Sequence, residues 1–224
     1  MRDRLMVALD MPDRARALAM RDAVGDAAGW MKVGMRLFVA EGPDLVRELL
    51  GRHRVFLDLK FHDIPNTVAQ AVESAGQLGV QMVNVHTSGG LAMMEAAAGA
   101  AAAFPGMLLI GVTVLTSDTR SAEEALRLAQ ERAVLAKRAG LHGVVCSAHE
   151  VRTIKAECGE DFLTVTPGIR WGGQDRQDQQ RIADPAMAVR EGADYLVVGR
   201  PILQAASPRR AAEEAVAMMM SSDG

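Results

Sequence analysis

The chain has 224 residues, of which 49% are hydrophobic and 24% are charged, and its formal net charge is −3 at pH 7. This length suits one large domain or at most two small ones, and the composition is typical of a soluble globular protein. We expect no nucleic-acid partner from this charge, although a small anionic ligand needs only a local basic site. The two cysteines are too few and too far apart for a four-cysteine zinc site, and they favour a reducing, cytoplasmic compartment.

The N-terminal segment and the apolar runs predict no signal peptide and no membrane span. Five successive apolar residues, 5–9, precede Asp10, which is too short a run for the apolar region of a signal peptide. No apolar run approaches the roughly 18 residues that a membrane-spanning helix needs. We therefore expect a cytoplasmic protein with no membrane partner.

Short apolar runs recur along the chain, and a segment with a helical pattern follows each of them. The predicted strands are residues 5–9, 30–34, 55–59, 81–85, 107–114, 143–146, 162–165 and 195–198. The predicted helices begin at Pro12 and then cover about 42–50, 65–78, 91–103, 121–139, 149–157, 185–191 and 208–220. Several strands are continuously apolar, as in strands buried on both faces. Eight strand–helix units predict an α/β fold, a (β/α)₈ barrel, as one domain of residues 1–224.

Local signals support three of these helices. Gly79 ends the helix at 65–78, because a glycine adopts the left-handed conformation that often follows a helix. Ser121 and Glu124 have the spacing of a capping box. The alanine-rich segment 91–103 resembles low complexity, but alanine is the best helix former. The alternative fold, an open doubly wound sheet, is favoured by a glycine-rich turn after the first strand, and Asp10-Met-Pro stands there instead.

Charged and polar residues gather where the predicted strands end, which is where barrels of this kind carry their functional groups. These residues are Asp10, Lys32, Asp58, Lys60, Asn84, His86, Thr113, Thr116, Arg170 and Arg200. Alternation places Asp58 and Lys60 on one face of their strand, within reach of Lys32. Two explanations stay open: a buried ion-pair network that fixes the barrel register, and a catalytic site. The common location at strand ends favours the catalytic site.

Asp63 lies beyond its strand, just before Ile64-Pro65. Because Pro65 biases Ile64 toward extended geometry, the chain turns away from the strand end at this point. Asp63 therefore either folds back onto its own site or projects into a neighbouring subunit.

Glycine and arginine follow the last two strands and suggest a phosphate site. Gly168 and Arg170 follow the seventh strand, and Gly199-Arg200 follows the eighth. Glycine lets backbone N–H groups approach an anion and arginine binds it through two donors, although each glycine alone could simply relieve a tight turn. The polar segment 171–180 is long for such a loop and predicts either a closing lid or an ordinary solvated loop.

The segment DLKFHDIPNT, residues 58–67, matches the signature of the orotidine 5′-monophosphate decarboxylase family along its whole length, and the chain resembles the bacterial form of that family. Further matches follow in the same order at 7–10, 32–34, 83–86, 112–116, 166–170, 178–179 and 198–201. The pattern Asp-x-Lys-x-x-Asp alone is also shared by sugar-phosphate decarboxylases and aldolases of the same superfamily. The HDIPNT continuation and the PGIR and GRP motifs make the resemblance more specific.

The resemblance implies a homodimeric barrel with shared active sites that converts orotidine 5′-monophosphate to uridine 5′-monophosphate, the last step of de novo pyrimidine biosynthesis. It implies a catalytic array of Lys32, Asp58, Lys60 and Asp63, in which the partner chain supplies Asp63 together with Thr67. The implied substrate-binding residues are Asp10, Lys32 and Thr67 at the ribose, Thr116 at the pyrimidine, and Arg170, Gln179, Gly199 and Arg200 at the phosphate.

The implied mechanism needs no metal and no organic cofactor. Loss of CO₂ leaves a carbanion in the plane of the pyrimidine ring, and a fixed ammonium group, that of Lys60, stabilises it and donates the proton. Two other functions remain as alternatives: a magnesium-dependent sugar-phosphate decarboxylase or aldolase on the same barrel, and a non-catalytic barrel that binds a phosphorylated ligand.

Overall fold

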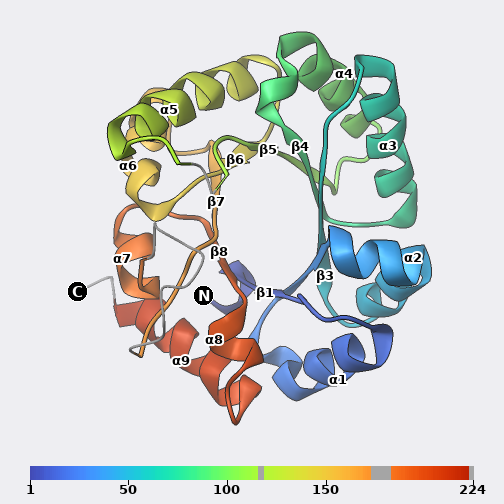
Figure 1. Ribbon diagram of the computed structural model, residues 1–224, viewed down its shortest axis with the longest axis vertical. Helices are drawn as coiled ribbons and strands as arrows, with labels where there is room; N and C mark the ends of the chain where they lie inside the picture. The colour runs from blue at the N-terminus through green and yellow to red at the C-terminus, as the bar shows by residue number, and fades with distance from the viewer. Residues whose placement is uncertain (116–118, 173–182, 222–224) are drawn as a thin grey trace.

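The computed structural model describes residues 1–115, 119–172 and 183–221, which form a closed barrel of parallel strands in sequential order, β1 to β8, with the helices outside (Figure 1). The strands are β1 (Leu5–Ala8), β2 (Trp30–Gly34), β3 (Arg54–Phe61), β4 (Met82–His86), β5 (Leu108–Val112), β6 (Gly143–Val145), β7 (Leu163–Thr166) and β8 (Tyr195–Val198). The α-helices are α1 (Arg14–Val24), α2 (Met35–Leu50), α3 (Pro65–Leu78), α4 (Leu91–Ala101), α5 (Ala122–Arg138), α6 (Ala148–Cys158), α7 (Pro185–Arg190), α8 (Arg200–Leu203) and α9 (Pro208–Met220). Three short 3₁₀ helices accompany them: η1 (Arg2–Arg4), η2 (Gly25–Ala27) and η3 (Thr87–Gly89).

The barrel closes through parallel pairing of the first and last strands, in which Leu5 lies opposite Leu196 and Val7 opposite Val198. One hydrophobic cluster joins alternate strand residues from around the barrel, among them Met6, Trp30 and Phe56. The intervening strand residues pack with the helices in a second, larger cluster. Both faces of the strands are therefore buried, which explains their continuous apolar runs. The predicted (β/α)₈ barrel is confirmed.

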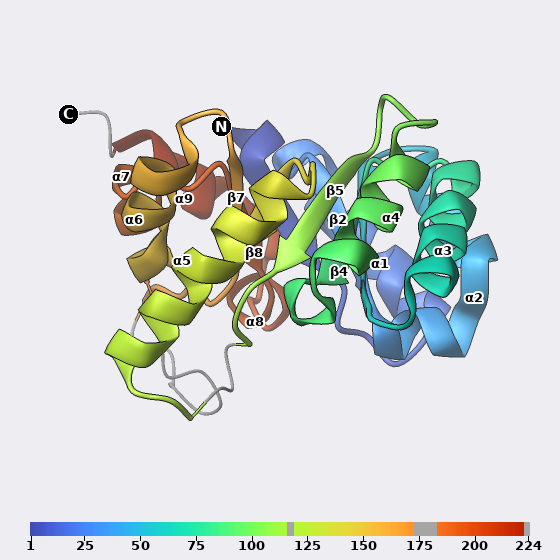
Figure 2. The same cartoon turned by 90° about the horizontal axis from the view of Figure 1, so that it is seen from above.

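Figure 2 separates the two ends of the barrel: the N-terminus lies at one end, and α8, which follows β8, lies at the other. In a parallel barrel all strands end on the same rim, so all eight strands end at the end marked by α8. No helix among the described residues is long and apolar enough to cross a membrane.

Two helices confirm their local sequence signals. The structure has α3 at the predicted bounds, with Pro65 in its first turn and Gly79 after it in the left-handed region at φ 88°. The capping box of α5 is present, since Ser121 and Glu124 exchange hydrogen bonds between side chains and backbone N–H groups.

Two predicted helix starts are wrong. The first helix begins at Arg14 and not at Pro12, because the Asp13 side chain accepts a hydrogen bond from the Arg16 N–H at 2.9 Å and caps the helix there. The second begins at Met35, seven residues before Gly42, where it was predicted to start. Gly42 instead lies within the helix at a kink, with φ 67° and ψ −163°. Gly42-Pro43 carries the sequence signal of a helix boundary, but here it only kinks a continuous helix.

Candidate active site

A cavity of about 240 Å³ opens at the carboxyl end of the barrel. Most of the sequence-predicted site residues line it: Asp10, Lys32, Asp58, Lys60, Arg170, Gly199 and Arg200. They come from β2 and β3 and from the segments that follow β1, β7 and β8. The barrel geometry therefore gathers residues that are up to 190 positions apart in the chain, because all these strands end on one rim.

The charged side chains in this cavity alternate in sign. Asp58 lies between two ammonium groups: its Oδ1 is 2.5 Å from the Lys60 Nζ and its Oδ2 is 3.1 Å from the Lys32 Nζ. The Lys32 Nζ also lies 3.5 Å from the Asp10 Oδ1. The side chains of Asp58 and Lys32 are only 13% and 10% exposed. Because each buried charge faces an opposite one, the array offsets part of the cost of removing it from water.

The same array sets the ionisation of its members. Burial raises the pKa of Asp58, but the charges of Lys32 and Lys60 outweigh burial and lower the pKa to about 2. Burial lowers the pKa of Lys32, but Asp58 and Asp10 outweigh it and leave the pKa above its ordinary value. At neutral pH the site therefore holds a carboxylate at Asp58 and an ammonium at Lys32.

We expect acid to remove stability through Asp58. Since the folded pKa of about 2 lies below the ordinary 3.8, this carboxyl stabilises the fold by about 2 kcal/mol above pH 4, and the contribution is lost as the pH falls through 2. About 1 kcal/mol of the free energy of unfolding should be lost between pH 5 and pH 3. Urea unfolding of the wild type and of Asp58→Asn at both pH values measures it. Equal losses in the two proteins would contradict this assignment.

The segments after β7 and β8 bring two guanidinium groups to the same cavity. Gly168 is in the left-handed region at φ 80°, a conformation that favours glycine, and it leads to Arg170. Gly199 leads directly into α8, whose first residue is Arg200. Arginine presents a fork of donors that matches the oxygens of a phosphate, so this side of the cavity suits a phosphorylated ligand.

Two of the predicted site residues do not line the cavity of this chain. Asp63 and Thr67 lie at the start of α3, and both are exposed. The Asp63 carboxylate accepts a hydrogen bond from the backbone N–H of Ile64 at 2.7 Å instead of reaching Lys60. Two others, Thr116 and Gln179, lie outside the described residues, as does the predicted lid from residue 173 onward.

The segment that follows β6 contributes two cavity residues that the sequence did not single out, Cys146 and Ser147. Ser147 is buried, and it forms a capping box with Glu150 at the start of α6. Burial, together with the nearby Glu150 and Asp194 carboxylates, raises the pKa of the Cys146 thiol, which argues against a reactive thiolate. The sequence signal for Ser147 is its position directly after the sixth predicted strand, residues 143–146.

The histidines near the cavity form no recognisable metal site. The rings of His62 and His86 lie 5.6 Å apart at a tilt of 40°. Burial and then the charge of His62 lower the pKa of His86. In the ranges that the structure describes, no three His, Cys, Asp or Glu side chains are grouped to hold a metal ion.

The sequence and the structure of the chain are both similar to those of known decarboxylases. The family model "Orotidine 5′-phosphate decarboxylase / HUMPS family" matches residues 3–215. The orotidine 5′-phosphate decarboxylase of Moorella thermoacetica is 49% identical over 226 residues, covering 94% of this chain and 90% of that protein. That of Legionella pneumophila, strain Paris, is 49% identical over 218 residues, covering 93% and 95%. The crystal structure of orotidine 5′-phosphate decarboxylase from Lactobacillus acidophilus has a TM-score of 0.85 at 34% identity, covering 97% of this chain and 99% of that one.

Proposed function

The chain belongs to the orotidine 5′-phosphate decarboxylase / HUMPS family, and from this premise we propose that it converts orotidine 5′-monophosphate to uridine 5′-monophosphate, the last step of de novo pyrimidine biosynthesis. Residues 1–224 act as a single decarboxylase domain in the cytoplasm. The observation that carries the proposal is the Lys60 ammonium, held 2.5 Å from Asp58 in a cavity that also receives two guanidinium groups.

The substrate lies across the cavity, with its phosphate and its reacting ring at opposite sides. The phosphate binds to Arg170, Gly199 and Arg200, joined by Gln179. The ribose hydroxyls bind to Asp10 and Lys32, and Thr67 of the partner subunit assists. The pyrimidine lies near Thr116, with the buried Ser147 hydroxyl as a further polar contact for the ring. The apolar cavity residues Val112, Val165 and Val197 exclude water from the reacting carbon.

The charges of the site account for the chemistry. When the bond between C6 and the carboxyl group breaks, both bonding electrons stay on C6 and CO₂ leaves. That electron pair lies in the ring plane and cannot delocalise into the π system, so its stabilisation has to come from a neighbouring positive charge. The Lys60 ammonium provides the charge and then transfers a proton to C6, and solvent reprotonates the amine. Neither a metal ion nor an organic cofactor takes part.

The contacts of the two guanidinium groups with the phosphate assist the reaction at C6, on the other side of the substrate. The two guanidinium groups do not contact the reacting carbon, so their attraction acts through positioning. Energy from such remote contacts lowers the barrier when it is used to orient the substrate and to close the site around it.

We also propose that the active unit is a homodimer in which each site receives Asp63 and Thr67 from the other chain. A second cavity, of about 310 Å³, shares Asp10, Lys32, Asp58 and Lys60 with the first and continues past Met35 and Arg36. Three large apolar side chains are exposed on α2 and before α3: Met35 at 55%, Val39 at 84% and Ile64 at 66%. Met35 lines this second cavity, and exposed apolar side chains beside a site are typical of an interface.

An ultraviolet assay with orotidine 5′-monophosphate in the presence of EDTA tests the proposed activity. The absorbance of the substrate should fall to that of uridine 5′-monophosphate, and chelation should leave the rate unchanged. A magnesium-dependent sugar-phosphate decarboxylase or aldolase would ignore this substrate and lose its own activity with EDTA. A binding barrel without catalysis would retain the nucleotide unchanged, which equilibrium dialysis detects.

A further inference from the structure

Asn84 contacts both of the residues that carry the proposed chemistry, although it comes from a different strand. It lies in β4 and is fully buried. Its Oδ1 accepts a hydrogen bond from the backbone N–H of Lys60 at 2.8 Å, and its Nδ2 donates to the Asp58 Oδ1 at 2.7 Å. One carboxamide therefore connects the backbone of the lysine to the carboxylate of its partner.

The backbone at Lys60 is unusual and explains why such a connection is needed. Lys60 has φ 53°, and no other residue except glycine has a positive φ in the part of the chain that the structure describes. For a residue with a side chain this conformation is strained, and it persists only where its surroundings enforce it.

The strain coincides with a bulge between β3 and β4. Leu57 pairs with Val83, and the next pair is Phe61 with Val85, so three residues of β3 lie opposite Asn84 alone. The regular ladder of backbone hydrogen bonds is interrupted there, and the Asn84 side chain supplies an acceptor to the Lys60 N–H. A bulge also redirects side chains. The Lys60 Nζ and the Asp58 Oδ1 lie 2.5 Å apart at this bulge.

We propose that Asn84 is a positioning residue that holds Lys60 in the bulge and fixes the Asp58 carboxylate against the Lys60 ammonium, an inference that rests on the proposed function of the site. The contacts require an acceptor at one end of a short side chain and a donor at the other. Aspartate has acceptors only, leucine of similar shape has neither, and glutamine is one methylene too long for a fully buried position. Burial raises the Asp58 pKa, the two lysines lower it by more, and the hydrogen bond from Asn84 adds a smaller lowering effect.

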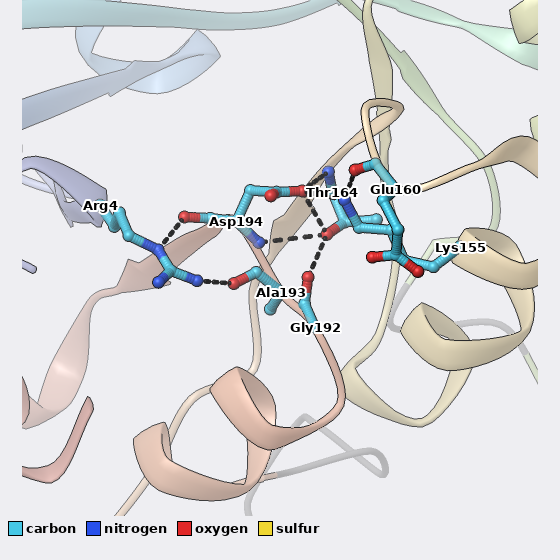
Figure 3. Close-up of polar contacts among 7 residues, drawn as sticks. All are labelled: Arg4, Lys155, Glu160, Thr164, Gly192, Ala193 and Asp194. Carbon is cyan, nitrogen blue, oxygen red and sulfur yellow. Dashed lines mark hydrogen bonds and ion pairs between the residues drawn. The ribbon is translucent and has the colours of Figure 1, made fainter. Parts of the chain in front are cut away.

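The first test compares Asn84→Leu with a matched control at the other end of the barrel. Thr164 is also fully buried, and its Oγ1 donates to the Asp194 Oδ2 at 3.0 Å, within a network that includes Arg4 and Lys155 (Figure 3). Both Asn84→Leu and Thr164→Val remove buried hydrogen bonds with little change of shape. We expect Asn84→Leu to lower kcat roughly 10²-fold, since a misplaced catalytic group costs about that much. KM should change little, because the phosphate contacts remain, and Thr164→Val should keep the wild-type kcat.

The second test uses Asn84→Asp and does not depend on how well the leucine variant folds. The introduced carboxyl keeps an acceptor for the Lys60 N–H but faces the Asp58 carboxylate, and two adjacent carboxylates raise the pKa of one of them. Once protonated, the introduced group can donate to Asp58 as the amide does. The ratio of kcat in Asn84→Asp to kcat in the wild type should therefore rise as the pH is lowered from about 8 to about 5.

A wild-type kcat in Asn84→Leu, a loss no larger than in Thr164→Val, or a ratio independent of pH in Asn84→Asp would each overturn the inference. A wild-type protein that does not decarboxylate the nucleotide would instead refute the proposed function. In that case a crystal structure of Asn84→Leu tests the positioning role of Asn84 without an activity measurement. If Lys60 keeps its positive φ and its contact with Asp58 there, Asn84 does not position them.

Discussion

Replacement of Lys60 by alanine is expected to abolish decarboxylation while the barrel stays folded. The variant loses the positive charge beside the carbanion and also the proton that quenches it. General acid catalysis typically contributes 10²–10⁴-fold, and one electrostatic contact about 10²–10³-fold, so kcat/KM should fall by roughly 10⁴-fold or more. The fold should survive, because the side chain is 26% exposed and Asp58 keeps its contacts with Lys32 and Asn84.

The ultraviolet assay measures the loss, and circular dichroism with thermal melting verifies the fold. Lys137→Ala is the matched control, since Lys137 donates to the carbonyl of Cys158 at 2.6 Å and does not line the candidate site. That variant should keep its activity. Substantial decarboxylation by a folded Lys60→Ala protein would rule out Lys60 as the proton donor.

Mixing two inactive variants, Asp58→Asn and Asp63→Asn, is expected to restore activity. If each site combines Asp58 of one chain with Asp63 of the other, a hybrid dimer has one doubly defective site and one intact site. Random exchange makes about half of the dimers hybrids, so the mixture should recover about one quarter of the wild-type activity. This expectation follows from the position of Asp63, which is exposed and accepts a hydrogen bond from the Ile64 N–H and not from the charged groups of its own cavity.

The control for this experiment is a mixture of Asp58→Asn with Lys60→Ala. Both of those residues line the cavity of the same chain, so each site of the hybrid keeps a defect and no activity should return. Subunit exchange can be followed with two affinity tags. If exchange is complete and the first mixture stays inactive, Asp63 does not act across an interface.

The amino-acid sequence determined the order of the elements and the region of the site. Periodicity alone gave eight strand–helix units, and a proline in the first turn with a glycine after the last placed α3 at its observed bounds. The charged site residues could be gathered without coordinates, because the strands of a parallel barrel all end on one rim. Asp10, Lys32, Asp58 and Lys60 do line one cavity there. These features depend on local propensity or on a general rule of the fold.

Only the tertiary structure decided how these residues meet. The left-handed backbone of Lys60 has no signal in its own strand, since its acceptor is a side chain 24 positions further along the chain. The cavity position of Ser147 depends on where β6 ends, and the exposure of Asp63 on where β3 and α3 separate. Distances of 2.5–3.5 Å between charges come from cross-strand packing, which joins residues that local sequence patterns treat as independent. The segment DLKFHDIPNT therefore specified which charges are present, and the barrel determined that Asp58 and Lys60 face the cavity of their own chain while Asp63 points away from it.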